Sequence, residues 1–134
     1  MIERIVNHHF VTDHYGYWPE FHDAEIISVY CNRNAENYSP SIEFKIQVSE
    51  ITNKIIGTHY KLIKHSIIEI ELLDVVEMDM KGFNMQNVAF YIIFGQDSEL
   101  LTMEVNPSYG LAAYVSARQI RIKKLEPKES DQKI

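Results

Sequence analysis

The stretch Ile42-Glu43-Phe44-Lys45-Ile46-Gln47-Val48 alternates strictly between apolar and polar residues. A period of two places successive side chains on opposite faces of a β-strand, so one face packs while the other meets water. This segment therefore predicts a half-buried strand, and it sets the fold class for the chain around it.

A strand is also predicted before this stretch, and loops are predicted on both sides of it. From Ala24 the chain enters the apolar run Ile26–Tyr30, and we expect Cys31 to be buried in the same strand. Residues 32–40 are rich in Asn, Ser and Pro, which favour turns, and should form an exposed connection. Residues 49–57 are predicted to form a second loop.

The segment from Tyr60 to Val75 alternates again and predicts a long strand. The same period continues over residues 76–81 after a break near Asp74, where we expect a bulge or a turn. Gly82–Asn87 is the next predicted turn, and Gly82 and Asn87 are candidate structural residues within it.

The last third of the chain predicts three more strands. Val88–Phe94 is apolar on both faces, which is typical of a central strand covered on two sides. Residues 95–98 have the length of a hairpin loop, and Leu101–Val105 should form a strand with one apolar face. Asn106–Gly110 predicts a turn, with Pro107 and Gly110 as candidate structural residues, and a final strand should run from Ala112 to Leu125.

About seven short strands with little helix indicate a mainly β fold, a curled antiparallel sheet or a sandwich. Apolar residues spaced by three and four over Ile2–Phe10 predict at most a short N-terminal helix. We expect one domain over residues 1–126, since a chain of 134 residues is long enough for a single core. Residues 127–134 are polar and should form a flexible tail.

Composition narrows the possible partners. The formal net charge of -6 would repel nucleic-acid phosphates, and the basic residues of Arg118–Lys124 alternate with Ile like the outer face of a strand. We therefore expect no nucleic-acid binding. The longest uncharged apolar stretch, Val88–Gly95, is far shorter than the ~20 residues of a membrane span, so no membrane partner is expected. The lone Cys31 and the lack of a signal-like segment favour the cytoplasm.

The densest group of functional side chains lies at Gly16–Glu25, which includes the only Trp. Gly16 relaxes the backbone and Pro19 restricts the residue before it, so a loop should present Trp18 in a set geometry. Aromatic clusters on stiff loops are typical of binding hot spots, although they can also cover one end of a sheet. Pro19 is a candidate structural residue. The candidate partner-binding residues are Tyr17, Trp18, Phe21, His22, Asp23 and Glu25.

Histidines near carboxylates raise two chemical alternatives. His8, His9, His14 and His22 lie close in sequence to Asp13, Asp23 and Glu25, but no typical zinc-ligand spacing occurs, so no metal or cofactor is expected. His22 and Asp23 could act as an acid/base pair, yet neighbours in an extended segment point to opposite sides. The structural interpretation is that Asp23 braces the loop through backbone N–H groups while His22 donates to a carbonyl.

Gly16-Tyr17-Trp18-Pro19-Glu20-Phe21-His22-Asp23-Ala24-Glu25-Ile26 resembles the Trp-Pro-x-Phe-His-Asp-Ala-Glu-hydrophobic signature of the immunity protein 50 family of bacterial polymorphic toxin systems. Val75–Asn87, Asn106–Gly110 and Ala117-Arg118 are similar to later parts of that family, so the likeness spans about Phe10 to Leu125. The resemblance implies a cytoplasmic antitoxin, not an enzyme, that binds a cognate toxin domain and blocks it.

An acidic chain fits a basic partner, for example a toxin that is a nuclease. Whether the signature contacts the toxin or holds the fold is left open by the resemblance. Two other functions also remain open: a small-ligand-binding or metal-dependent enzyme domain that uses the region of His22 and Asp23, and a structural interaction subunit.

Overall fold

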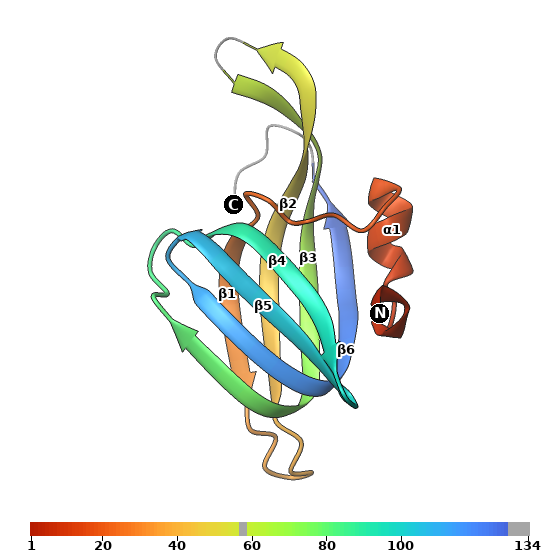
Figure 1. Cartoon of the computed structure of the whole chain (residues 1–134), viewed down its shortest axis with the longest axis vertical. Helices are drawn as coiled ribbons and strands as arrows, with labels where there is room; N and C mark the ends of the chain where they lie inside the picture. Colours follow the sequence, from red (N-terminus) through yellow and green to blue (C-terminus); the bar gives the residue numbers. More distant parts are fainter. Residues whose placement is uncertain (57–58, 129–134) are drawn as a thin grey trace.

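The computed structural model describes residues 1–56 and 59–128, with side chains described outside residues 50–64. Its central feature is an antiparallel sheet closed into a barrel in the strand order β1-β2-β3-β6-β5-β4 (Figure 1). The predicted class, a mainly β fold built on a curled antiparallel sheet, is confirmed. The six strands are β1 (Glu25–Asn32), β2 (Ser41–Ile56), β3 (His59–Lys81), β4 (Val88–Asp97), β5 (Leu100–Tyr109) and β6 (Ala112–Pro127).

The structure has six strands where about seven were predicted, because β3 continues through the expected break. Asp74 has a positive φ of 56°, and the register of β3 with β6 shifts between Val75 and Glu77. The predicted bulge is therefore present, but it bends one strand without ending it.

This bend opens one end of the barrel. The pairing of β2 with β3 ends at Ser41 and Leu73, whereas β6 follows β3 as far as Lys81. The last part of β3 therefore crosses away from β2 and runs with β6 alone. Beyond the other end of the barrel, β2 and β3 project as a two-stranded hairpin (Figure 1).

The core fills the barrel with side chains from alternate positions. Ile42, Phe44, Ile46 and Val48 of the opening stretch are all at most 3% exposed, as the period of two predicts. The apolar face of β5 is buried in the same cluster through Leu101, Met103 and Val105.

The expectation for Val88–Phe94 is wrong on one face. Ile92 is buried, but Phe90 and Ile93 are 52% and 50% exposed. A barrel is a single layer of strands whose outer face meets solvent unless another element covers it. Cys31 is likewise exposed, although it lies in β1 as predicted.

Strands occupy part of three predicted loops. The predicted loop at residues 49–57 is wrong as far as Ile56, because β2 continues there in register with β3; residue 57 lies outside the described residues. β4 continues through Gly95 to Asp97, so only Ser98 and Glu99 connect it to β5. β5 includes Pro107 and ends at Tyr109, which leaves Gly110 and Leu111 as the turn. Apolar and strand-compatible residues allowed pairing to extend further than local turn signals indicated.

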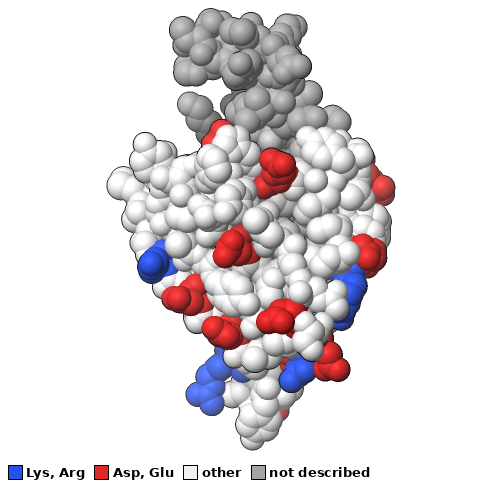
Figure 2. All heavy atoms as spheres, in the orientation of Figure 1, with Lys and Arg blue, Asp and Glu red and all other residues white. Residues whose placement is uncertain are grey.

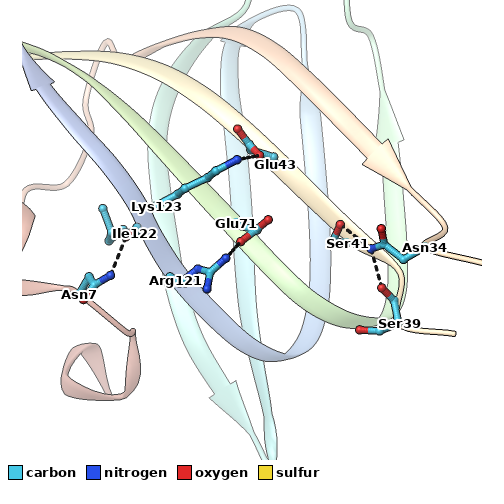
Figure 3. Close-up of polar contacts among 9 residues, drawn as sticks. All are labelled: Asn7, Asn34, Ser39, Ser41, Glu43, Glu71, Arg121, Ile122 and Lys123. Carbon is cyan, nitrogen blue, oxygen red and sulfur yellow. Dashed lines mark hydrogen bonds and ion pairs between the residues drawn. The ribbon is translucent and has the colours of Figure 1, made fainter. Parts of the chain in front are cut away.

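The N-terminus forms two short helical pieces in place of one helix, η1 (Ile2–Arg4) and α1 (His9–Tyr15). Between them Val6 pairs with β6, since its N–H donates to Ile120 O at 2.9 Å and its carbonyl accepts from Ile122 N at 2.8 Å. The Asn7 side chain donates to Ile122 O at 3.2 Å (Figure 3). These bonds attach the N-terminus to the β6 side of the barrel.

The apolar face predicted for the N-terminal helix is only partly buried. Ile5 is fully buried, but Val6 and Phe10 are each 37% exposed, and the buried residues of α1 are Val11 and Tyr15. The Tyr15 hydroxyl lies 2.6 Å from Ser66 Oγ inside the barrel end. Among the described residues no helix is long and apolar enough to cross a membrane.

Three of the candidate structural residues form one cluster at the open end of the barrel. Asn87 is 3% exposed, and its Oδ1 accepts from the N–H groups of Asn84 (3.0 Å) and Leu111 (3.1 Å) while its Nδ2 donates to Asn84 O at 2.7 Å. The side chain of Asn87 therefore joins the connection between β3 and β4 to the turn between β5 and β6.

Two glycines allow this close approach. Gly82 and Gly110 have positive φ values of 81° and 74°. A Cβ at Gly82 would lie 2.6 Å from Gly110 O, and one at Gly110 would lie 2.4 Å from Gln86 O and 2.5 Å from Asn87 Oδ1. The backbones are thus in contact where any side chain would separate them.

Replacing Gly110 with Ala should destabilise the fold by about 2–3 kcal/mol, because backbone strain adds to a clash with Gln86 and Asn87. Gly16 is a matched control: its φ is also positive, at 84°, but a Cβ there would meet nothing within 4 Å. Gly16→Ala should therefore cost about 1 kcal/mol, the strain alone. Equilibrium urea unfolding measures the free energy of unfolding of both variants. Equal decreases in the two would show that the close contact at Gly110 contributes nothing to stability.

Candidate partner-binding site

The segment Glu20–Ile26 closes the barrel by pairing with Asn87–Ile92; we call this junction the seam. Four backbone hydrogen bonds form it: Ile92 N to Glu20 O (3.2 Å), Asp23 N to Ala89 O (2.9 Å), Ala89 N to Ala24 O (2.8 Å) and Ile26 N to Asn87 O (2.8 Å). Most of the Trp-Pro-Glu-Phe-His-Asp-Ala-Glu stretch therefore joins β1 to β4.

The sequence predicts that His22 and Asp23 are part of an extended segment. The backbone of the seam is not extended. Phe21 and Asp23 have φ values of 62° and 63°, in the left-handed region. Two such residues reverse the usual alternation, so Phe21 and Ala24 point inward and are each 1% exposed. His22 and Asp23 are brought together, with His22 Nε2 3.6 Å from Asp23 Oδ2. The expectation that these two side chains diverge is wrong.

An aromatic cluster fills the barrel end beneath the seam. The ring centroid of Trp18 lies 5.7 Å from that of Phe21 and 5.4 Å from that of Phe94, both in edge-to-face geometry. Phe21 and Phe94 are themselves 6.0 Å apart. Such pairs contribute about 0.5–1.5 kcal/mol beyond their buried area. Phe21 is buried by this packing and exposes almost no surface to a partner.

His22 completes the seam at a bulge in β4. The register of β4 with β5 shifts between Ala89 and Tyr91, and His22 Nδ1 lies 2.8 Å from Phe90 O. A carbonyl only accepts, so Nδ1 carries the proton and donates, as the structural interpretation predicted. Asp23 braces the loop differently from that prediction: its own backbone N–H donates, and its carboxylate faces His22.

Two hollows that share Pro19 lie beside some of the remaining candidates, although Asp23 and Glu25 line neither. One hollow of about 370 Å³ is lined by Tyr17, Trp18 and His22 among others, and a second of about 420 Å³ extends from Trp18 over Tyr91 and Ile93. Tyr17, His22, Asp23 and Glu25 are exposed and Trp18 is half-buried. Their role in partner binding stays a prediction.

A second surface was not anticipated. Between β3 and β4, Phe83 and Met85 are 55% and 98% exposed. Beside them the open barrel end holds a hollow of about 310 Å³. It is lined by Val29, Met80, Phe83 and Leu111, and also by Cys31 and Lys81. The available signal was two large apolar residues inside a predicted turn, where polar residues are usual.

Among the described residues no three His, Cys, Asp or Glu side chains converge in a way that could hold a metal ion. His8 contacts the carbonyl of Ile5 at 3.1 Å, and the His9 ring packs edge-on against Phe10 at 4.8 Å.

A family model described as immunity protein 50 (Imm50) matches residues 7–128. The chain belongs to the immunity protein 50 family. This confirms the resemblance drawn from the Trp-Pro segment. A comparison with curated proteins and one with solved structures gave no significant match.

One outer face of the Imm50 barrel has its charges paired. Across β2, β3 and β6, Arg121 binds Glu71, and Lys123 Nζ lies 3.1 Å from Glu43 Oε2 (Figure 3). The hydrogen bond that Lys123 donates to Glu43, together with the negative charge of that carboxylate, raises the pKa of Lys123. These two carboxylates are therefore compensated by cations within the sheet.

The face formed by β4, β5 and the end of β3 is different. Figure 2 shows Asp and Glu side chains gathered over its middle, with Lys and Arg toward its margins. Glu77, Asp79 and Glu104 are exposed there, and within the described residues none of the three forms an ion pair with Lys or Arg. This acidic face of the Imm50 chain is therefore uncompensated.

If the seam residues mainly hold the Imm50 fold, the loss of stability on substituting each one should increase with how deeply its side chain is buried. Phe21→Ala should destabilise by about 3–5 kcal/mol, because it empties the aromatic cluster. His22→Ala should cost about 1 kcal/mol, because it removes one hydrogen bond at a half-exposed site. Chemical unfolding followed by the fluorescence of Trp18 measures both. A stable Phe21→Ala variant would contradict the structural role.

Proposed function

We propose that this Imm50 chain binds a cognate bacterial toxin domain and blocks it by occlusion, without turnover. The family match over residues 7–128 is the observation that carries the proposal. An immunity protein needs a stable surface that fits its toxin, and inhibition by occlusion requires no chemistry of its own.

The architecture supports this role. A stable protein complex buries about 800 Å² on each partner around a few apolar or charged anchors. The barrel offers exposed apolar side chains next to uncompensated carboxylates, and the seam and the Asn87 cluster fix the connections between strands. A preformed surface loses little conformational freedom on binding.

We further propose that the toxin is basic, for example a nuclease, and that the complex forms in the bacterial cytoplasm. The net charge of -6 and the acidic face favour a partner of opposite charge and would raise the association rate. A lone exposed thiol at Cys31 suits a reducing compartment.

A second candidate function is an enzyme or ligand-binding domain centred on His22 and Asp23. The 3.6 Å contact between these side chains beside a hollow of about 370 Å³ is the observation that favours it. Against it, Nδ1 of His22 is already engaged by Phe90 O, which leaves one ring nitrogen for chemistry. A purely structural interaction subunit would bind a partner without protecting any cell.

Co-expression tests the proposal directly. We expect this chain to restore survival of a sensitive cell in which the C-terminal domain of the protein encoded immediately upstream is induced, and to co-purify with it. Titrating purified toxin with this chain should abolish toxin activity at one equivalent, because occlusion is stoichiometric. His22→Gln should titrate to the same end point.

Two results would count against occlusion. Loss of toxin activity at far less than one equivalent would indicate turnover, and its dependence on His22 would point to the enzyme alternative. A toxin that this chain binds but does not inhibit would indicate the interaction-subunit alternative.

A further inference from the structure

We propose that the toxin docks on the open end of the barrel, with Phe83, Met85 and the adjoining hollow as apolar anchor and Asp79 and Glu104 as charged rim. The inference rests on the proposed function and names the surface and the chemistry of the partner. The occupant is a basic protein surface in which Arg or Lys side chains surround an exposed aliphatic or aromatic one.

The first argument is the cost of exposing these residues. Met85 is 98% exposed and Phe83 is 55% exposed, and Tyr109, next to the Gly110 that contacts Gly82, is 65% exposed. Scattered apolar residues are normal on a protein surface, but Phe83 lines an apolar hollow and Met85 follows it two positions later, and large exposed side chains beside such a hollow are typical of an interaction site. Methionine suits such a site because its flexible side chain adapts to a partner.

The second argument is that the connection carrying them is held in place. Besides the three hydrogen bonds of Asn87, the Asn84 side chain donates to Gly82 O at 3.0 Å and accepts from Gln86 N at 2.9 Å. Close contact between Gly82 and Gly110 fixes the connection against the β5–β6 turn. A flexible loop could fold its apolar side chains inward; in this connection the backbone is already held with them outward, so little backbone freedom is lost when a partner binds.

The third argument is charge. Asp79 on β3 and Glu104 on β5 both pair in register with Tyr114 on β6, which lies between them. All three line a shallow hollow of about 240 Å³, which shares Lys81 with the apolar hollow. Two strand spacings separate the carboxylates by about 10 Å. A guanidinium or ammonium group placed over Tyr114 would therefore be attracted by both carboxylates and would form a cation–π contact with the ring. A basic partner therefore fits this end of the barrel.

The seam is the competing surface, and geometry favours the open end. At the seam Phe21 is buried, His22 is bonded to Phe90 O, and Trp18 packs on two rings. In contrast, within the described residues no polar or ring contact engages Phe83 or Met85.

The test measures binding of the catalytically inactivated C-terminal toxin domain encoded immediately upstream. We expect Phe83→Ser combined with Met85→Ser to weaken the dissociation constant by about 100-fold, as loss of hot-spot anchors does. Phe10→Ser is the matched control: Phe10 is 37% exposed on α1, beside β6 on the other side of the barrel (Figure 1), and its replacement should leave affinity unchanged.

Asp79→Asn combined with Glu104→Gln should lower the association rate by about tenfold and flatten its salt dependence, because steering depends on charge. Glu99→Gln, at the exposed turn between β4 and β5, is the control and should change neither.

Two native reporters distinguish the surfaces in the wild-type chain without any substitution. Cys31 is the only cysteine and lines the apolar hollow, so its alkylation by a maleimide should slow at least about tenfold in the complex. Trp18 is the only Trp, and 5-fluorotryptophan at that position should keep its ¹⁹F chemical shift.

A complex that protects cells but leaves Cys31 reactive and shifts the Trp18 resonance would overturn this surface while leaving the proposed function intact. A wild-type chain that neither binds nor protects would overturn both.

Discussion

Closure of the barrel depends on four backbone hydrogen bonds between residues 20–26 and 87–92. Without them β1 and β4 would each be an open edge, with unpaired N–H and C=O groups available to other chains. At about 0.5–1.5 kcal/mol each, these bonds together amount to a large part of the 5–15 kcal/mol that separates a typical folded domain from its unfolded state. A short segment that precedes β1 thus determines whether the sheet is a barrel.

The seam holds an unfavourable backbone, and the residue types of the segment explain how. Left-handed φ values at Phe21 and Asp23 cost on the order of 1–3 kcal/mol each. Complete burial of Phe21 returns roughly 1.5–3 kcal/mol, and its contacts with Trp18 and Phe94 add to this. His22 then satisfies the carbonyl at the β4 bulge. A signature rich in aromatic and polar groups is therefore accounted for by the geometry of closure.

Sequence reasoning was accurate where a local pattern decides the structure, and inaccurate where a distant partner does. The alternation over Ile42–Val48 predicted a half-buried strand correctly, because alternate residues of a strand point to opposite faces and only one face is buried. Composition cannot show whether Val88–Phe94 is covered on both sides, since that depends on a second layer. The contact between His22 and Asp23 was missed because it follows from left-handed residues that only pairing with β4 maintains. Asn87 was placed in a turn, but its partner Leu111 lies 24 positions away.

The carboxylates on the two faces of the barrel differ in whether they are paired with cations. On β2, β3 and β6 the carboxylates of Glu43 and Glu71 are each paired with a cation, so their charges are largely compensated. On the other face neither Asp79 nor Glu104 forms an ion pair with Lys or Arg among the described residues, so their mutual repulsion is relieved less than the charges of Glu43 and Glu71 are. Folding gives no reason for this imbalance, nor for holding Met85 in water. A basic partner with an apolar anchor would remove both penalties on binding, which is why the open end accounts for recognition while the seam accounts for the fold.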